Sequence, residues 1–342
     1  MITKQDYIRS LLLNNHNQIQ DTGHAFAPSN IALVKYWGKR QTELNLPLTD
    51  SLSISLAHLG ARTLIKEKAQ EKIHSNKNQD TFILNDQTVD LTHAFSKRLT
   101  AMLDLFRPTP HTTYHVNTTS NIPIAAGLAS SACGFAALIL ALNNLYHWQL
   151  SDQILSILAR IGSGSAARSI FHGFVHWRTG ILDDGRDSYA YRLNQTWPEL
   201  CIGLVIFEHG EKIMSSRAGM QHTIATSPLY ASWPKTVEND LEHIQTAITQ
   251  YDFTALGQIA EGNALAMHAT MHSARPALMY STAETISAMQ TIWQLRQDGL
   301  EVYFTQDAGP NLKLLFQQKD KNIIQDYFPN ITIIQPFKDI TE

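Results

Sequence analysis

Residues 123–134 read PIAAGLASSACG, a run of small side chains with two adjacent hydroxyls, and an apolar stretch to Trp148 follows directly. Apolar residues cover nearly every face of this stretch, which predicts a buried helix beginning at Ser131. The N–H groups at a helix N-terminus carry partial positive charge, and small side chains let an anion approach them. The segment therefore favours phosphate binding, although an ordinary loop packed tightly against a helix explains it equally well. The Gly-Lys-Ser/Thr ending of the Walker motif is missing.

Strand patterns dominate before this segment, and helix patterns are more frequent after it. Residues 51–56 alternate strictly between serine and apolar side chains, which predicts a half-buried strand. Further strands are expected at 31–34, 63–65, 81–84, 115–119, 200–207, 302–305 and 312–316. Helices are expected at 151–160 (with Ser151 as N-cap), 233–251, 253–270 and 281–298. Strands and helices in separate blocks predict an α+β fold of two lobes.

The length of the chain sets the number of domains. Its 342 residues, 44% of them hydrophobic, are enough for about two domains or two lobes of one fold. We divide the chain into an N-terminal extension (1–23), a first lobe (24–197) and a second lobe (198–342). The extension is polar and forms either one amphipathic helix or a loose segment. Its sequence assigns it no function.

Charge and hydropathy narrow the class of protein. The chain has 27 Lys and Arg against 30 Asp and Glu, a net charge of −3, so nothing predicts a nucleic-acid or anionic-membrane partner. No apolar run is long enough for a signal peptide or a membrane span. We therefore expect a cytoplasmic protein in which Cys133 and Cys201 are free, buried thiols.

A second loop of small residues, GSGSAAR at 162–168, follows the helix expected at 151–160. Arg168 carries a planar fork of donors that matches a carboxylate or a phosphate. A surface arginine that caps the preceding helix is an equally good interpretation of this loop alone. Two such loops in one chain favour phosphate handling more strongly than either loop by itself.

Two further segments place charged side chains where strands are expected to end or turn. Lys35 follows the apolar run 31–34, where a lysine usually reaches solvent. The functional alternative is an ammonium group that faces an anionic substrate. Asp307 opens DAGPN at 307–311, which by itself is typical of a turn. Its carboxylate is also suited to orient or deprotonate a hydroxyl group.

His268 and His272 stand four residues apart on an expected helix, a spacing that suits zinc. No glutamate lies between them, and the sequence offers no evident third ligand. We therefore interpret both as ordinary helix residues.

Four of these segments together resemble one family, the diphosphomevalonate decarboxylases of the GHMP kinase superfamily. Residues 123–134 resemble the superfamily's phosphate-binding loop, and KYWGK at 35–39 resembles the N-terminal signature of the decarboxylases. ARIGSGSAARS at 159–169 is similar to their substrate loop, and 307–311 is similar to their catalytic-aspartate loop. The similarity extends over 27–316.

The resemblance implies a two-lobed GHMP kinase fold, with a ribosomal S5-like N-terminal lobe and an α/β-sandwich C-terminal lobe. It also implies ATP- and Mg2+-dependent conversion of (R)-5-diphosphomevalonate to isopentenyl diphosphate, CO2, ADP and phosphate, by way of phosphorylation of the C3 hydroxyl. In that reaction Asp307 would orient or deprotonate the hydroxyl, Lys35 would stabilise charge around its oxygen, and Arg168 would hold the substrate carboxylate.

The same resemblance assigns binding residues. The substrate set is Tyr36, Trp37, Gly38, Lys39, Ser163, Gly164, Ser165, Ala166, Ala167, Arg168 and Ser216. The nucleotide set is Gly127, Leu128, Ala129, Ser130 and Ser131, with Ser130 also assigned to Mg2+. The family further suggests a homodimer. Two positions depart from its pattern: Ala167 replaces a frequent Cys, and Asp50 replaces a common Asn, which adds negative charge near an anionic site.

Two other kinds of function remain open at this point. One is a mevalonate or phosphomevalonate 3-kinase, or a decarboxylase of the monophosphate. Asp307 and Lys35 together argue against a pure kinase, and Lys39 with Ser163 and Ser165 argues for a diphosphate tail. The other is a non-catalytic sensor that binds ATP and a ligand, which the full catalytic set disfavours.

Overall fold

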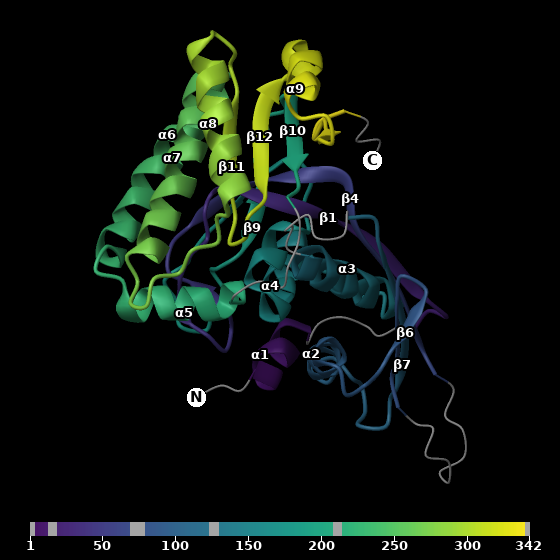
Figure 1. The fold of residues 1–342 in the computed structure, drawn as a ribbon. Coiled ribbons are helices and arrows are strands. Elements are labelled where there is room, and N and C mark those ends of the chain that lie inside the picture. Colours follow the sequence, from purple (N-terminus) through teal and green to yellow (C-terminus); the bar gives the residue numbers. More distant parts are fainter. Residues whose placement is uncertain (1–3, 13–18, 69–78, 123–129, 208–213, 339–342) are drawn as a thin grey trace.

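Two β-sheets organise the molecule. The computed structural model describes residues 4–12, 19–68, 79–122, 130–207 and 214–338 (Figure 1). The first sheet has the order β6-β5-β7-β4-β8-β9, and β1 also pairs with β4. Its strands are β1 (Gly23–Val34), β4 (Ser51–Glu67), β5 (Thr81–Leu84), β6 (Gln87–Val89), β7 (Tyr114–Ser120), β8 (Phe174–Trp177) and β9 (Ala190–Arg192). The short strands β2 (Lys39–Gln41) and β3 (Leu46–Pro47) form a separate ribbon.

The second sheet has the order β11-β12-β10-β13. Its strands are β10 (Leu200–Val205), β11 (Tyr303–Gln306), β12 (Leu312–Gln317) and β13 (Thr332–Ile334). The helices that follow the first strand of this sheet are α5 (Ser216–Thr226), α6 (Trp233–Gln250), α7 (Phe253–His272), α8 (Ala283–Gln297) and α9 (Lys321–Tyr327). In Figure 1 the long helices α6, α7 and α8 stand together on one side of this sheet. The predicted mixture of strands and helices is confirmed, and most of the expected elements end within a few residues of their predicted bounds. The strand expected at 31–34 is the end of the longer β1, and α5 and α9 were not predicted.

The first lobe is built on the buried helix α3 (Ser130–Leu145), which confirms the helix expected after the small-residue segment. Its side chains join α2 (Ala94–Leu103) and α4 (Asp152–Gly162) in one apolar core beneath the first sheet. The backbone of β1 approaches α3 so closely that a Cβ at Gly23 would lie 2.0 Å from the Ala141 carbonyl oxygen. Only glycine fits there. Ser151 caps α4 as expected, accepting from the Ile154 N–H.

Strand β4 differs from the expectation in two ways. Residues 51–56 and 63–65 belong to one strand of 17 residues rather than to two strands. The prediction that 51–56 is half-buried is wrong, because every residue of that stretch is buried. Its apolar face enters a core shared by both lobes, and its serine face is covered by the loop that contains Arg168. The alternation therefore marks a polar interior face rather than a face toward water.

One apolar cluster joins the two lobes. It combines Ile31 and Leu33 of β1 with Ile244 of α6 and Met271 of α7, all fully or almost fully buried. The end of β1 consequently lies at the junction of the lobes, where residues from distant parts of the chain meet.

The N-terminal extension contains a helix, α1 (Lys4–Leu12), so the first of its two open alternatives is confirmed for these residues. Tyr7 and Ile8 are buried in the core of the first lobe, and Leu11 and Leu12 pack against it. Along the described ranges, no helix combines the length and the apolar character needed to cross a membrane.

Candidate active site

Strand β1 delivers Lys35 into a buried site. The lysine side chain is only 2% exposed, so the solvent-facing alternative is excluded. Its backbone N–H donates to Asn263 Oδ1 (2.8 Å), and Asn263 Nδ2 donates in turn to Asp240 Oδ2 (2.7 Å). These bonds hold the end of the strand, and Lys35 Nζ donates to Asp307 Oδ1 at 2.7 Å.

Asp307 lies between two buried ammonium groups. Lys313 on β12 places its Nζ 3.2 Å from Asp307 Oδ2, while Lys35 binds the other oxygen. Burial alone raises the pKa of the Asp307 carboxyl, but the charges of Lys35 and Lys313 outweigh it and hold that pKa well below its usual range. The carboxylate is therefore ionised, and its side chain remains 30% exposed.

Burial also determines the charge state of Lys35. Together with the charges of Lys313 and Arg168, burial lowers the pKa of Lys35 to about 8, although Asp307 favours the charged form. Lys35 is mostly protonated at neutral pH and titrates in the mildly alkaline range.

Lys313 was not identified from the sequence. The signal was a lysine inside the apolar run 312–316, where side chains alternate between the two faces of a strand. Lys313 shares its face with Leu315, which belongs to the core between the lobes. A lysine on such a face has no route to water, so it requires an anionic partner.

His268 supports the loop that carries Asp307. It is buried on α7, and its Nε2 donates to the Asp307 carbonyl oxygen at 3.2 Å. Burial, with His272 and Lys35, lowers the pKa of His268 to about 3, so the ring is neutral. The two histidine rings lie 6.0 Å apart, and the described residues contain no group of three His, Cys, Asp or Glu that would hold a metal.

Arg168 ends the short 3-10 turn Gly164–Arg168 with its side chain inside the protein. The arginine is 3% exposed, so the surface-cap alternative is wrong. Nη1 donates to Ser51 Oγ at 2.7 Å, Nε donates to Asn30 Oδ1 at 3.3 Å, and the guanidinium lies over the Trp177 ring. Burial lowers its pKa to about 10, so it stays charged. It forms no ion pair with a described carboxylate, which leaves its charge available to an anion.

The serines of the loop at 162–168 meet the start of α3. Ser163 Oγ lies 3.4 Å from Ser131 Oγ and 3.4 Å from Ser165 Oγ. Ser130 is the first residue of the helix. These contacts bring the loop at 162–168 to the start of α3, although the two are about 30 positions apart in the sequence. Gly127, Leu128 and Ala129 lie outside the described residues.

Tyr36 lines the same region through its ring and hydroxyl. Its ring stands edge-on to Trp177 at 4.8 Å, and its hydroxyl is buried without a hydrogen-bond partner among the described atoms. Burial raises the pKa of the hydroxyl far above its ordinary value. A Cβ at Gly164 would come 2.7 Å from this hydroxyl, so the loop approaches Tyr36 as closely as glycine permits.

Four of the residues predicted for substrate binding serve mainly in packing. Trp37 is buried in the core between the lobes, and its carbonyl accepts from the Tyr230 hydroxyl at 2.8 Å. Gly38 has φ +134°, and a Cβ there would lie 1.9 Å from the Tyr230 oxygen. Ala166 and Ala167 are fully buried and contribute no polar side-chain atom.

Lys39 opens into a cavity of about 190 Å³ that Arg217 and Gln221 of α5 also line. Lys39 Nζ donates to Asn45 Oδ1 at 2.6 Å, a neutral acceptor. Burial lowers the pKa of Lys39 to about 8, and neighbouring cations, Arg217 foremost, act in the same direction. Ser216 is the first residue of α5 and directly precedes Arg217 of the cavity lining. The cavity is thus positively charged and suits an anion.

Asp50 is held by hydrogen bonds to His176 and Thr179. Its carboxylate accepts from His176 Nε2 and from the Thr179 N–H, each at 2.7 Å. Burial opposes its ionisation, but these two bonds prevail and lower its pKa. Its negative charge therefore has partners of its own.

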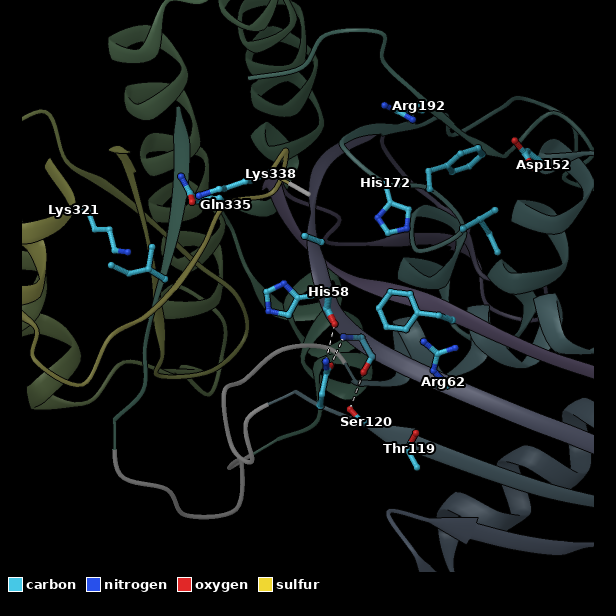
Figure 2. A pocket seen from close by; sticks show the side chains of 17 residues that line it. His58, Arg62, Thr119, Ser120, Asp152, His172, Arg192, Lys321, Gln335 and Lys338 are labelled. Carbon is cyan, nitrogen blue, oxygen red and sulfur yellow. Dashed lines mark hydrogen bonds between the residues drawn. The ribbon is translucent and has the colours of Figure 1, made fainter. Parts of the chain in front are cut away.

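A wider cavity of about 1310 Å³ lies elsewhere (Figure 2). Basic residues surround it, among them Arg62 and Arg192 on one side and Lys321 and Lys338 on the other, as Figure 2 shows. None of the residues that line it belongs to the site predicted from the sequence.

A buried Lys35–Asp307–Lys313 group, an Arg168 that has no ion-pair partner among the described residues, and serines that meet at the start of α3 define an enzyme that acts on phosphorylated small molecules. A family model described as the diphosphomevalonate decarboxylase-like N-terminal domain matches residues 27–190. A second, the mevalonate 5-diphosphate decarboxylase C-terminal domain, matches residues 202–341. The chain belongs to the diphosphomevalonate decarboxylase family, and it is an enzyme.

Individual relatives agree with the family models. The diphosphomevalonate decarboxylase of Candida albicans is 34% identical over 305 residues, which cover 86% of this chain and 84% of that protein. The Saccharomyces cerevisiae enzyme of the same name is 34% identical over 318 residues, which cover 88% and 79%.

Solved structures confirm the expected GHMP kinase fold. The mevalonate diphosphate decarboxylase of Staphylococcus aureus superposes with a TM-score of 0.85 at 36% identity and covers 92% of this chain and 95% of that one. The protein named MDDEF, solved with MVAPP, AMPPCP and magnesium, superposes with a TM-score of 0.84 at 38% identity and covers 92% and 97%.

Proposed function

We propose that Lys35, Asp307 and Arg168 carry out the reaction of this family in this chain, the ATP-dependent decarboxylation of (R)-5-diphosphomevalonate. The products are isopentenyl diphosphate, CO2, ADP and phosphate. The observation that carries this proposal is the ionised Asp307 held between two buried lysines beside a buried arginine that has no ion-pair partner in the described chain.

The first task of the site is to prepare the C3 hydroxyl. A tertiary alcohol is a poor leaving group, so its oxygen must first take the γ-phosphoryl group of ATP. A carboxylate with a strongly lowered pKa is a weak base, and Asp307 therefore acts mainly by accepting a hydrogen bond that orients the hydroxyl. The Lys35 ammonium stabilises negative charge on the same oxygen.

The second task is decarboxylation. The C3–O bond breaks, and its electron pair leaves with phosphate. The C1–C2 bond then breaks to release CO2, and its electron pair forms the C2=C3 double bond. Arg168 grips the C1 carboxylate through its two-pronged guanidinium and keeps the C1–C2 bond aligned with the electron-poor C3. Ser51 and Asn30 hold the guanidinium in that orientation.

The diphosphate tail occupies the cavity lined by Lys39. Its negative charge offsets that of the cations there. The hydroxyls of Ser163, Ser165, Tyr36 and Ser216 are not in the lining of the cavity, and they donate to the part of the diphosphate that extends beyond it. The unpartnered Tyr36 hydroxyl supports this assignment, since a buried hydroxyl requires an acceptor.

ATP phosphates fit the start of α3, where Ser130 and Ser131 provide hydroxyl groups. Mg2+ neutralises phosphate charge during the transfer. The Ser130 hydroxyl, on the first residue of α3, would be a ligand from this chain to a Mg2+ ion that also binds the phosphate oxygens.

The direct test incubates the protein with ATP, Mg2+ and one of mevalonate, its 5-phosphate or its 5-diphosphate, and follows ADP and CO2 together. We expect equal amounts of ADP and CO2, and only with the diphosphate. ADP without CO2 would identify a 3-kinase, and CO2 from the monophosphate would identify the alternative decarboxylase. Neither product with any substrate would favour a sensor.

We also propose the two-lobe division at 197/198, a cytoplasmic location and a homodimer. Each of the two large sheets uses strands from one side of the division, which supports it. The free, buried Cys133 and Cys201 suit a reducing compartment. Light scattering of the purified protein tests the homodimer, and cell fractionation tests the location.

A further inference from the structure

The N-terminal helix α1 is anchored beside the cavity lined by Lys39. Tyr7 and Ile8 hold one face of the helix in the core of the first lobe. This packing places Lys4, the first residue of α1, in the lining of the cavity. The matched N-terminal family model begins only at residue 27, so α1 lies before the part that the model describes.

Three cations from different parts of the chain converge on this cavity. Lys4 comes from α1, Lys39 from β2 and Arg217 from α5. The acidic residue in the lining is Glu43, whose Oε2 lies 3.4 Å from Lys4 Nζ. One carboxylate against three cations leaves the cavity with net positive charge.

The pair between Lys4 and Glu43 is weak. The lysine side chain is 33% exposed and the glutamate 77%, and exposed pairs of this kind contribute little to stability. Lys4 can therefore exchange Glu43 for a stronger acceptor at small cost, while Glu43 returns to water. A phosphate oxygen is such an acceptor.

We propose that Lys4 binds the outer phosphate of the substrate's diphosphate group and favours the diphosphate over the monophosphate. This inference rests on the proposed function, which places the diphosphate in the same cavity. The outer phosphate carries the charge that the monophosphate lacks. A third cation at the rim of the cavity therefore strengthens binding of the diphosphate more than binding of the monophosphate.

The test compares Lys4→Gln with Arg9→Gln, which removes the same charge from the exposed side of the same helix. We expect Lys4→Gln to raise the KM for 5-diphosphomevalonate about threefold to tenfold with kcat unchanged, the usual effect of one lost charged contact. Arg9→Gln should match the wild type, and Lys4→Arg should restore most of the lost affinity. Equal KM values for Lys4→Gln and Arg9→Gln would overturn the proposal.

A binding measurement separates this proposal from the proposed function. In calorimetry with inorganic pyrophosphate as the probe, Lys4→Gln should weaken binding by a similar factor, whereas its effect with inorganic phosphate should be smaller. Unchanged pyrophosphate binding in Lys4→Gln refutes the role of Lys4, whatever the enzyme does. A wild-type protein that releases no CO2 refutes the proposed function, while the calorimetric comparison still decides the role of Lys4.

A pH profile tests whether Lys4 lies close enough to Lys39 to affect its charge. Besides burial, the cations Arg217, Arg98 and Lys4 keep the pKa of Lys39 low, and Glu43 is the acidic group in the cavity lining. Removing the charge of Lys4 should therefore raise the pH at which the affinity for substrate falls. An unshifted profile in Lys4→Gln would contradict a position of Lys4 beside Lys39.

Discussion

The two charged regions of this site differ in how far their cations are balanced by carboxylates. Around Asp307, a carboxylate balances two buried lysines, and hydrogen bonds hold each member in one place. Around Lys39, three cations line a cavity with one exposed carboxylate, Glu43, which pairs with Lys4. In the first region the charges pair with one another and orient a reacting group. In the second region the positive charges are available to bind an anionic ligand. Substitutions in the first should therefore lower kcat, and substitutions in the second should raise KM.

The largest effect is expected for Asp307→Asn. The amide keeps the size of the side chain but removes the charge that orients the hydroxyl and pairs with two lysines. We expect kcat to fall by roughly a thousandfold or more, within the range for general acid–base and electrostatic groups. Calorimetry should show nearly normal nucleotide affinity, and a parallel loss of that affinity would make Asp307 a structural residue.

Arg168→Lys should be the next most severe change. An ammonium cannot reproduce the planar fork that contacts Ser51 and Asn30 and faces the substrate carboxylate. We expect kcat for CO2 release to fall by about a hundredfold, as for other positioning groups. Steady-state kinetics that stay near those of the wild type would remove Arg168 from the decarboxylation step.

Lys313→Met tests the residue that the sequence did not reveal. Loss of this cation should raise the pKa of Asp307, which two lysines now depress, and should also raise the pKa of Lys35, which Lys313 now lowers. The alkaline limb of the pH profile of kcat, which reports Lys35, should therefore move to higher pH, with a loss of about tenfold at neutral pH. An unmoved alkaline limb would contradict the link between Lys313 and the reacting group.

In the wild type, the decline of kcat at alkaline pH should follow the loss of the proton from Lys35. Its pKa of about 8 lies below the ordinary value for lysine, so its charge is present below pH 8 and is lost as the pH rises through that value. We expect kcat to decline above about pH 8 if the ammonium stabilises the C3 oxygen. A kcat that stays constant to pH 10 would show that the charge of Lys35 is dispensable.

Lys39→Gln should have the smallest effect of this series on turnover. Its Nζ contacts only the neutral Asn45 among the described hydrogen-bond partners, so its charge is available to the diphosphate. We expect KM to rise about tenfold or more while kcat changes little, because the contact is the same before and during the reaction. A fall in kcat at constant KM would break the contrast between the two regions.

The sequence indicated the segments of the site more reliably than the state of their side chains. Lys35 and Arg168 were equally compatible with surface positions, because burial depends on what the other lobe covers and not on local pattern. The same reason explains the wrong prediction for 51–56, whose serine face meets Arg168 instead of water. The periodicity of a sequence shows that the two faces of a strand differ in polarity. It does not show whether protein or water covers each face.

Lys313 and α1 are two features that local sequence patterns did not predict, because both depend on tertiary contacts. The role of Lys313 becomes evident only when β11 and β12 are paired, because this pairing places Asp307 in the turn between them, next to Lys313. Most residues of the N-terminal extension are polar, so the sequence did not indicate that Tyr7 and Ile8 dock its helix in the core. The predicted helices and the α+β class needed only composition and spacing, which explains why they were predicted well.

The most direct test of the central claim is a crystal structure of this chain with 5-diphosphomevalonate bound. The account predicts that the C1 carboxylate accepts from the Arg168 guanidinium and that the C3 oxygen lies within hydrogen-bond reach, about 2.6–3.2 Å, of both Asp307 and Lys35. It also predicts the diphosphate beside Lys39. A substrate whose C3 oxygen lies beyond the reach of Asp307, or whose carboxylate and diphosphate exchange ends, would contradict it.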